Sequence, residues 1–263
     1  MAPQILAADG GFHPPSLTDF FPPAVLFEGT PFELNRIMLI RILIALVLCV
    51  VLVMIAKRAT LIPNKVQSVF EMGLDFVRTE IAEQFLGADA RRFLPFLATL
   101  FFGISAFNIT GIIPGFNMAS TALFGLPLLL SVWVYLVYLA AGVQRQGLWG
   151  YLKTNMFPAG VPVFLYPLIT PIELLQIFVI RPATLAIRLT ANMIAGHLLL
   201  VLCFSATQTL IMHGTSLQKG IGVFALAGGL IFTLFEILVA FLQAYVFTLL
   251  AAVYISMALE AAH

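Results

Sequence analysis

The sequence carries very little charge. Of its 263 residues only 13 are Lys or Arg and 12 are Asp or Glu, which is 10% of the chain, whereas an ordinary soluble domain carries about 25%. Hydrophobic residues make up 61%. A soluble protein of this size could not cover its surface with so few charges, because about a quarter to a third of a folded surface is normally Lys, Arg, Glu and Asp. We therefore expect lipid to be the solvent of this chain.

Other shortages exclude further classes of protein. The formal net charge of +1 argues against nucleic-acid binding, which needs a clustered basic face. The two cysteines, Cys49 and Cys203, lie inside apolar runs, so the chain is not a disulfide-stabilised secreted domain. It also lacks a Gly-rich phosphate-binding loop. We expect no nucleic-acid partner, no cofactor and no metal site.

Long apolar runs are abundant instead. About 20 apolar residues are needed to cross a hydrocarbon core of about 30 Å. The first such run, residues 37–56, ends at Lys57 and Arg58. Residues 93–113 and 120–142 are predicted to form a second and a third span, separated by a turn-like uncharged segment.

Two longer runs follow, at residues 162–206 and 220–258, with a predicted polar break at Thr207–Lys219 between them. Each run exceeds what one perpendicular crossing needs, so each must tilt, bend or lie partly in the membrane plane. The predicted fold class is an all-α integral membrane protein with about five membrane-embedded helices, the last two long and strongly tilted.

Residues 66–86 differ from these runs, because apolar side chains recur at helical spacing opposite charged ones. This pattern predicts an amphipathic helix on the inner membrane surface, whose charged face is either solvated or docked to a partner helix. The predicted segments are an external N-terminal tail at 1–35, the first transmembrane helix at 36–58, the surface helix at 63–90, two transmembrane helices with linkers at 91–161, and the two long tilted helices at 162–263.

The distribution of Lys and Arg predicts the orientation, because cytoplasmic flanks retain positive charge. If the first span runs from outside to inside, the outer face receives Arg36 and Lys219, and Arg41 can snorkel outward from within the span. The inner face then collects Lys57, Arg58, Lys65, Arg78, Arg91, Arg92, Arg145 and Lys153. We therefore predict an external N-terminus and an internal C-terminus.

Few charges remain inside the membrane. The two long C-terminal runs hold Glu173, Arg181, Arg188 and Glu236, with His197 as a further titratable group. A charged side chain at mid-bilayer costs about 2.5–3.5 kcal/mol, so such residues usually face a partner or a water-filled cavity. Each is therefore a candidate functional residue.

Helical phase groups some of these residues into a polar stripe. At about 100° per residue, Arg181 and Arg188 differ by only about 20°, and Asn192 lies about 40° from Arg188. Glu173 falls on the same broad side if the helix continues through Pro182.

Glu236 and Gln243, seven residues apart, form a second stripe on the last run, while His197 points away from the face of Arg188. An arginine stays protonated in practically any protein environment, so Arg188 can hold a fixed positive charge that blocks the leak of cations. Neighbouring Glu, His, Asn and Gln can exchange protons or orient water. The combination predicts ion translocation around a fixed positive gate.

Structural roles remain open for the same residues. Arg188 and Glu236 could form a salt bridge within the bundle. His197 could be a hydrogen-bonded packing residue, and Asn192 and Gln243 could join neighbouring helices by hydrogen bonds.

Two segments resemble a known family. RPATLAIRLTANMIAGHLLLVL (181–202) and EILVAFLQAYVFTLLAAVYISMALE (236–260) closely resemble subunit a of the rotary proton-translocating ATP synthase membrane sector. The segments FFPPAVLFEGTPFELNR, LIPNKVQSVFE and FNITGIIPG give weaker support.

The resemblance implies roles for individual residues. Arg188 is similar to the essential arginine that faces the rotor ring of c subunits, with Asn192 one turn away and Gln243 opposite it. His197 and Glu236 resemble the titratable pair of the outer access channel, in an order that some members reverse.

The resemblance also implies what other chains supply. Two offset half-channels would deliver protons to and from carboxylates of the c ring, and Glu173 resembles the acidic residue near the inner exit. The implied partners are the c-subunit ring, the peripheral-stalk b subunits, other ATP synthase subunits and the lipid bilayer. The chain would itself be a membrane subunit that binds no nucleotide.

An autonomous ion channel or secondary transporter is the alternative function. Transporters commonly contain inverted repeats, and no repeat is evident here. The external tail and the amino-acid sequence of residues 181–200 suit a bacterial plasma membrane, with the mitochondrial inner membrane as the alternative location.

Overall fold

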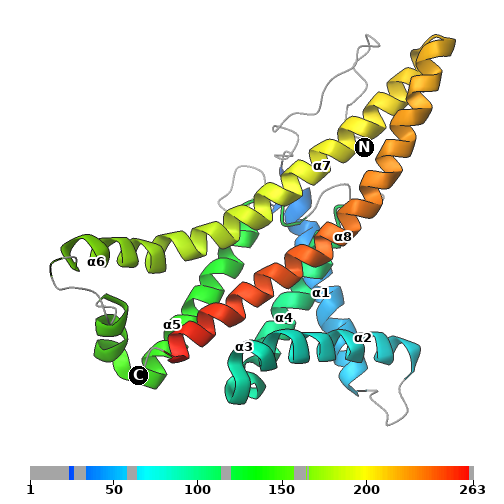
Figure 1. Ribbon diagram of the computed structural model, residues 1–263. Helices are drawn as coiled ribbons and strands as arrows, with labels where there is room; N and C mark the ends of the chain where they lie inside the picture. The colour runs from blue at the N-terminus through cyan, green and yellow to red at the C-terminus, as the bar shows by residue number, and fades with distance from the viewer. Residues whose placement is uncertain are drawn as a thin grey trace.

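The computed structural model describes residues 24–26, 34–57, 64–113, 120–156, 164 and 166–260. Apart from two very short strands and a few connecting residues, this part of the chain is helical (Figure 1). The elements are β1 Ala24–Leu26, β2 Leu34–Asn35, α1 Arg36–Lys57, α2 Lys65–Phe76, the π-helical η2 Val77–Glu83, α3 Gln84–Leu86, the 3-10 turn η3 Gly87–Asp89, α4 Ala90–Ile109, α5 Gly125–Met156, α6 Tyr166–Leu175, the π-helical η5 Gln176–Ile180, α7 Arg181–His213 and α8 Ser216–Glu260.

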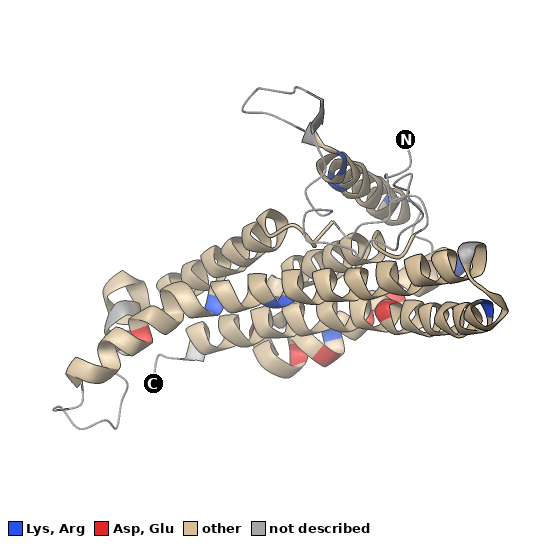
Figure 2. Ribbon diagram, turned by 90° about the horizontal axis from the view of Figure 1, so that it is seen from above, with Lys and Arg blue, Asp and Glu red and all other residues tan. Residues whose placement is uncertain are grey.

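Five helical stretches in the described part of the chain are long and apolar enough to cross a membrane, which confirms the predicted fold class. Charged residues form isolated patches on a bundle that is otherwise uncharged (Figure 2). The stretches are 36–57, 65–109, 125–151, 166–212 and 216–259.

The N-terminal region contains more order than the predicted tail implied. Strands β1 and β2 pair antiparallel directly before α1, with Ala24 opposite Asn35 and Leu26 opposite Leu34. The rest of the predicted tail, residues 1–23 and 27–33, lies outside the described residues.

The predicted surface helix is one helical path through α2, η2 and α3 that lies across the end of α4 (Figure 1). Its second half packs on the bundle, because Val77 and Ile81 are fully buried. Phe70 stacks on Phe102 of α4 with ring centroids 4.7 Å apart. Val66 in the first half stays exposed, as expected of a helix that lies on a membrane surface.

The third span begins later and ends later than predicted. Residues Ser120–Phe124 are irregular, because Ser120 and Thr121 use their side chains in hydrogen bonds to α4. At the other end α5 bends at Gly147, whose φ of 73° and ψ of 159° are not helical. The helical geometry therefore continues beyond the apolar stretch from which the span was predicted.

The predicted polar break between the last two runs is wrong in extent. Helix α7 continues to His213 and α8 begins at Ser216. Two threonines of the expected break lie within α7, where their hydroxyls are satisfied by carbonyls one turn earlier. Thr207 Oγ1 bonds Cys203 O at 2.7 Å, and Thr209 Oγ1 bonds Ser205 O at 2.9 Å. The connection shrinks to Gly214 and Thr215.

Helices α7 and α8 form an antiparallel pair that crosses α4 and α5 obliquely, and their joined ends project beyond the other helices (Figure 1). The core lies where the pair crosses α4 and α5. Its fully buried large side chains include Leu97, Leu100, Ile104, Val134, Tyr138, Leu189, Phe247 and Ile255. The crossing region therefore packs α7 on each side of Arg188, at Leu185 and Leu189, and α8 next to Gln243, at Ala244.

The bend at Gly147 places the ring of Tyr151 against Gly142, where a Cβ atom would collide with it. We expect Gly142→Ala to lower the free energy of unfolding by about 1–3 kcal/mol, because overpacking forces the ring or backbone to move. The matched control is Gly103→Ala in α4, where a Cβ meets nothing within 4 Å. Thermal unfolding of the purified chain in detergent, followed by fluorescence, should show a lower midpoint only for Gly142→Ala. Equal midpoints would contradict the packing of this bend.

Candidate functional site

Arg188 lies on the exposed side of α7. Its neighbours Leu185 and Leu189 are buried in the core, whereas the Arg188 side chain points away from it. No hydrogen bond or ion pair joins Arg188 to another residue in the described ranges. A guanidinium at this position is available to a neighbouring chain.

The stripe predicted around Arg188 is divided between two environments. The guanidinium of Arg181 lies 5.3 Å from the ring centre of Tyr254 in α8, a cation–π contact that fixes α7 to α8. Asn192, one turn beyond Arg188, is half-buried. Arg181 is therefore a packing residue, and Arg188 with Asn192 forms the part of the stripe open to a partner.

Glu173 lies half-buried on α6, before the stripe. The helical path continues through Pro182, as the phase argument required. The π turn Gln176–Ile180 adds one residue to a helical turn. Viewed along the helix axis, the angle between Glu173 and Arg188 therefore changes from about 60° in one direction to about 40° in the other. Glu173 remains on the same broad face but lies about 22 Å along the helix from Arg188.

Glu236 lies inside the bundle, with 5% of its surface exposed. One carboxyl oxygen, Oε2, is buried and has no hydrogen-bond partner within the described part of the chain. Burying an ionised carboxylate without a partner costs several kcal/mol. The site is therefore suited to a carboxyl group that exchanges a proton or binds water.

Gly196 makes room for this carboxyl group on α7. A Cβ atom at Gly196 would lie 2.9 Å from Glu236 Oε1 and 3.2 Å from its Cδ, closer than side chains normally approach. The next residue, His197, is also buried, with 9% exposed. The structure thus places the Glu236 carboxyl group in a glycine notch of α7, and the buried His197 is the residue that follows this notch in the sequence.

This arrangement excludes one alternative left open by the sequence. Glu236 meets α7 at Gly196, about two turns or 12 Å beyond Arg188. Arg188 and Glu236 therefore form no salt bridge, and the ion pair found among the described residues is Arg78–Glu83. Within the described part of the chain Arg188 therefore has no counterion.

The predicted second stripe faces the interior of the bundle. Gln243 is 7% exposed and lies two turns after Glu236 on the same face of α8. The buried polar groups Glu236 and Gln243 are thus separated by about 10 Å along one helix.

The sequence did not predict a buried polar cluster that lies near Glu236 and consists of Asn108, Thr110, Ser120 and Thr121. Asn108 Nδ2 donates to Ala240 O of α8 at 3.2 Å, and Thr121 Oγ1 donates to Asn108 Oδ1 at 2.6 Å. Ser120 N donates to Thr110 Oγ1 at 3.1 Å. All four polar side chains are at most 1% exposed. A signal was present, because these residues flank the turn between two apolar runs, but only packing shows that they are buried beside α8.

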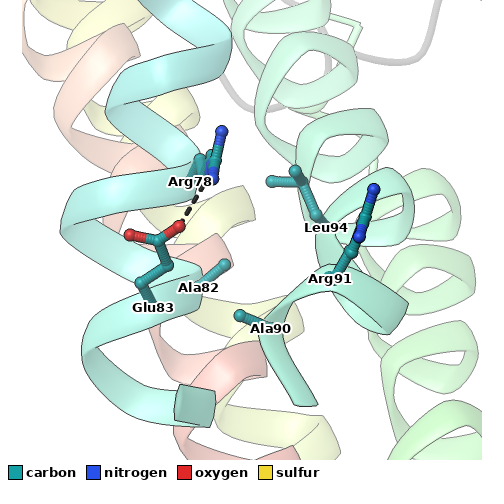
Figure 3. A pocket seen from close by; sticks show the side chains of 6 residues that line it. All are labelled: Arg78, Ala82, Glu83, Ala90, Arg91 and Leu94. Carbon is teal, nitrogen blue, oxygen red and sulfur yellow. Dashed lines mark hydrogen bonds and ion pairs between the residues drawn. The ribbon is translucent and has the colours of Figure 1, made fainter. Parts of the chain in front are cut away.

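A pocket elsewhere in the molecule lies apart from these residues. It sits between η2 and the start of α4 and is lined by Arg78, Ala82, Glu83, Ala90, Arg91 and Leu94 (Figure 3). Arg78 Nε and Glu83 Oε1 form an exposed ion pair of 2.8 Å within it, so its charges partly neutralise each other. None of the predicted site residues lines this pocket.

Comparison with known proteins supplies the family. The family model of the ATP synthase A chain matches residues 38–256. ATP synthase subunit a of Rhodococcus erythropolis is 47% identical over 257 residues, which cover 97% of this chain and 93% of that protein. The same subunit of Pseudarthrobacter chlorophenolicus is 38% identical, covering 96% and 95%, and that of a Nocardioides species is 37% identical, covering 100% and 99%.

The chain belongs to the ATP synthase subunit a family. The resemblance first seen in residues 181–202 and 236–260 is confirmed and extends over nearly the whole chain. This family is the proton-translocating membrane component of ATP synthase and not a catalytic subunit. The chain is a multi-pass membrane protein and part of that complex.

The glycine notch gives a test of the geometry in this subunit a. Gly196→Ala should lower the rate of proton-driven ATP synthesis about threefold to tenfold, because the added Cβ displaces the carboxyl group of Glu236, which the sequence predicts to exchange protons, and small displacements at such a group are costly. The matched control is Gly228→Ala in α8, where a Cβ meets nothing within 4 Å. Rates would be measured in proteoliposomes that contain the assembled complex. Equal rates for both variants would show that the notch does not position Glu236.

Proposed function

We propose that this chain is the stator channel subunit of ATP synthase, in which two offset half-channels carry protons to and from the carboxylates of a c ring. Arg188 acts as the fixed positive gate between them. Proton flow through the two half-channels is thereby coupled to rotation of the ring and to ATP synthesis. The observation that carries this proposal is an exposed Arg188 that is unpaired within the described residues and lies about two helical turns along α7 from the buried Glu236.

The exposure of Arg188 supports a partner that carries negative charge. An arginine facing lipid in mid-membrane is unfavourable unless it meets a counterion, a polar group or water. A carboxylate that passes α7 on a rotating ring would supply such a counterion. Once it releases its proton near Arg188, the ionised form is stabilised by the fixed positive charge. The same charge repels free cations and prevents a short circuit between the half-channels.

Glu236 and His197 form the outer half-channel in this proposal. Both are buried and separated from Arg188 along α7, so protons reach the ring on one side of the gate only. Glu173 marks the inner exit, on the opposite side of Arg188 along the same helix. Asn192 and Gln243 lie near the level of the gate and orient water or the ring carboxylate.

The proposed orientation places the N-terminus outside and the C-terminus inside a bacterial plasma membrane. Four basic residues lie at or near helix ends: Lys57 in α1, Lys65 in α2, Arg91 in α4 and Arg145 in α5. Successive membrane-spanning helices run in opposite directions. Alternation puts these ends on one side of the membrane, as positive-inside orientation requires. The peripheral-stalk b subunits and the c ring are proposed as partners within this orientation.

Replacing the gate residue tests the function. Arg188→Ala should reduce coupled ATP synthesis by at least about a hundredfold, since a preorganised charge of this kind contributes several kcal/mol to a charge-transfer step. The matched control is Arg145→Ala, an exposed arginine of α5, which should retain activity. Both complexes are rebuilt in proteoliposomes with equal subunit ratios. Unchanged coupled flux in Arg188→Ala would refute the gate, and purification of an active chain without a c ring would favour an autonomous channel or transporter.

Replacing the buried carboxyl group tests the outer half-channel. Glu236→Gln keeps the shape of the side chain and removes its acid–base function, so synthesis should fall about tenfold or more. Glu236→Asp should retain more activity than Glu236→Gln, because it keeps a carboxyl group. Passive proton flux through membranes stripped of the soluble catalytic head would be measured as well. Wild-type flux in Glu236→Gln would rule out a proton-carrying role.

A further inference from the structure

Arg41 is a charged residue inside the apolar helix α1 that the proposed proton path does not use. The sequence predicts that it snorkels outward to water, but the structure shows a different arrangement. Arg41 Nε donates to Ser120 O at 2.8 Å, and Nη2 donates to Leu123 O at 3.1 Å. The guanidinium thus binds two backbone carbonyls of the irregular segment Ser120–Phe124.

These bonds connect a helix that otherwise packs loosely. Within α1 only Ile37 and Ile40 are buried, and both lie within one turn of Arg41. Most of the later side chains of α1, such as Leu46 and Val50, are exposed. Arg41 therefore lies at the point where α1 is attached to the rest of the described bundle.

The segment that Arg41 holds is itself bound to the bundle next to the proton site. Thr121 donates to Asn108, and Asn108 donates to Ala240 O, one turn after Glu236 on α8. Ala122 is buried with Met193 of α7 in a small cluster against which the partly buried Val239 of α8 packs. The segment thus packs on α7 and is joined to α8 through Asn108 and this cluster.

We infer that Arg41 is a positioning residue for the outer half-channel. By holding Ser120–Phe124, it fixes Asn108 and Ala122 against α7 and α8, and through them the separation of the two helices at Glu236. Arg41 touches neither the proton nor the ring. This inference rests on the proposed function, because the path through Glu236 must carry protons for its geometry to matter.

The chemistry of arginine suits this position. Its planar guanidinium offers several N–H donors in a fixed fork, which lets it bind two carbonyls of different residues at once. Backbone carbonyls in an irregular segment lack helical partners, so in a membrane they need donors from side chains. A lysine can supply donors and the charge but not the fork. Arg41→Lys should therefore retain part of the positioning effect that Arg41→Gln loses.

The test uses the intact complex in proteoliposomes, with ATP synthesis measured against outer proton concentration at a constant membrane potential. In Arg41→Gln the half-saturating outer proton concentration should rise about threefold to tenfold, a typical effect of a residue that acts through its neighbours. The maximal rate should change less. Arg41→Lys should lie closer to the wild type than Arg41→Gln. The matched control Lys57→Gln, which removes a cation from the other end of α1, should superimpose on the wild type.

A second variant decides the question even if Arg41→Gln does not assemble. Thr121→Val leaves α1 and its charge intact but removes the hydroxyl that donates to Asn108. It should raise the half-saturating proton concentration in the same way, and adding it to Arg41→Gln should produce little further change. Curves for Thr121→Val and any assembled Arg41→Gln that match the wild type would overturn the inference. Independent, multiplying effects of the two substitutions would also overturn it.

Failure of this inference differs from failure of the proposed function. If Arg188→Ala retains coupled flux in the same assay, the proposed function is refuted. If Arg188→Ala is inactive while Arg41→Gln and Thr121→Val behave like the wild type, only the positioning role of Arg41 is refuted.

Discussion

The structure depends on one constraint, the high cost of an unsatisfied polar group in a medium without water. This cost forces the backbone into helices, which satisfy their own N–H and C=O groups. It also explains why threonines within α7 donate to carbonyls one turn earlier and the helix continues past them. Where the chain leaves helical geometry at Ser120–Phe124, side chains of Arg41 and Thr110 bond its free backbone groups.

The same constraint makes the few polar groups without an internal partner candidates for function. Among the described residues, a buried carboxyl oxygen of Glu236 and the buried hydroxyl of Ser105 have no hydrogen-bond partner, and the exposed guanidinium of Arg188 has no counterion. Of these groups, Glu236 and Arg188 are the ionisable ones, so their charges remain available to something outside the chain. A proton or water suits the enclosed carboxyl group, and a passing carboxylate suits the exposed arginine. Their separation of about two helical turns keeps the two functions apart.

Rigid positioning of these groups comes from small residues and buried amides. Gly196 lets the Glu236 carboxyl group lie against α7, and the cation–π contact between Arg181 and Tyr254 joins the same two helices further along. Asn108 reaches the α8 backbone from α4. Glu236 and His197 therefore lie on two helices that are joined by contacts on each side of the notch.

The sequence by itself determined the class of the protein, its apolar spans and the residues to which function can be assigned. Charge is so costly in lipid that Arg188 and Glu236 stand out without any structure, and helical phase places Gln243 on the face of Glu236. Only the tertiary structure decided which of these residues meet. It separated Arg188 from Glu236, placed Gly196 against the carboxyl group, and joined Arg41 to Ser120 across the bundle. The physical reason is that phase and hydrophobicity are local properties of one helix. The register and spacing of two packed helices depend on side chains that are distant in the sequence.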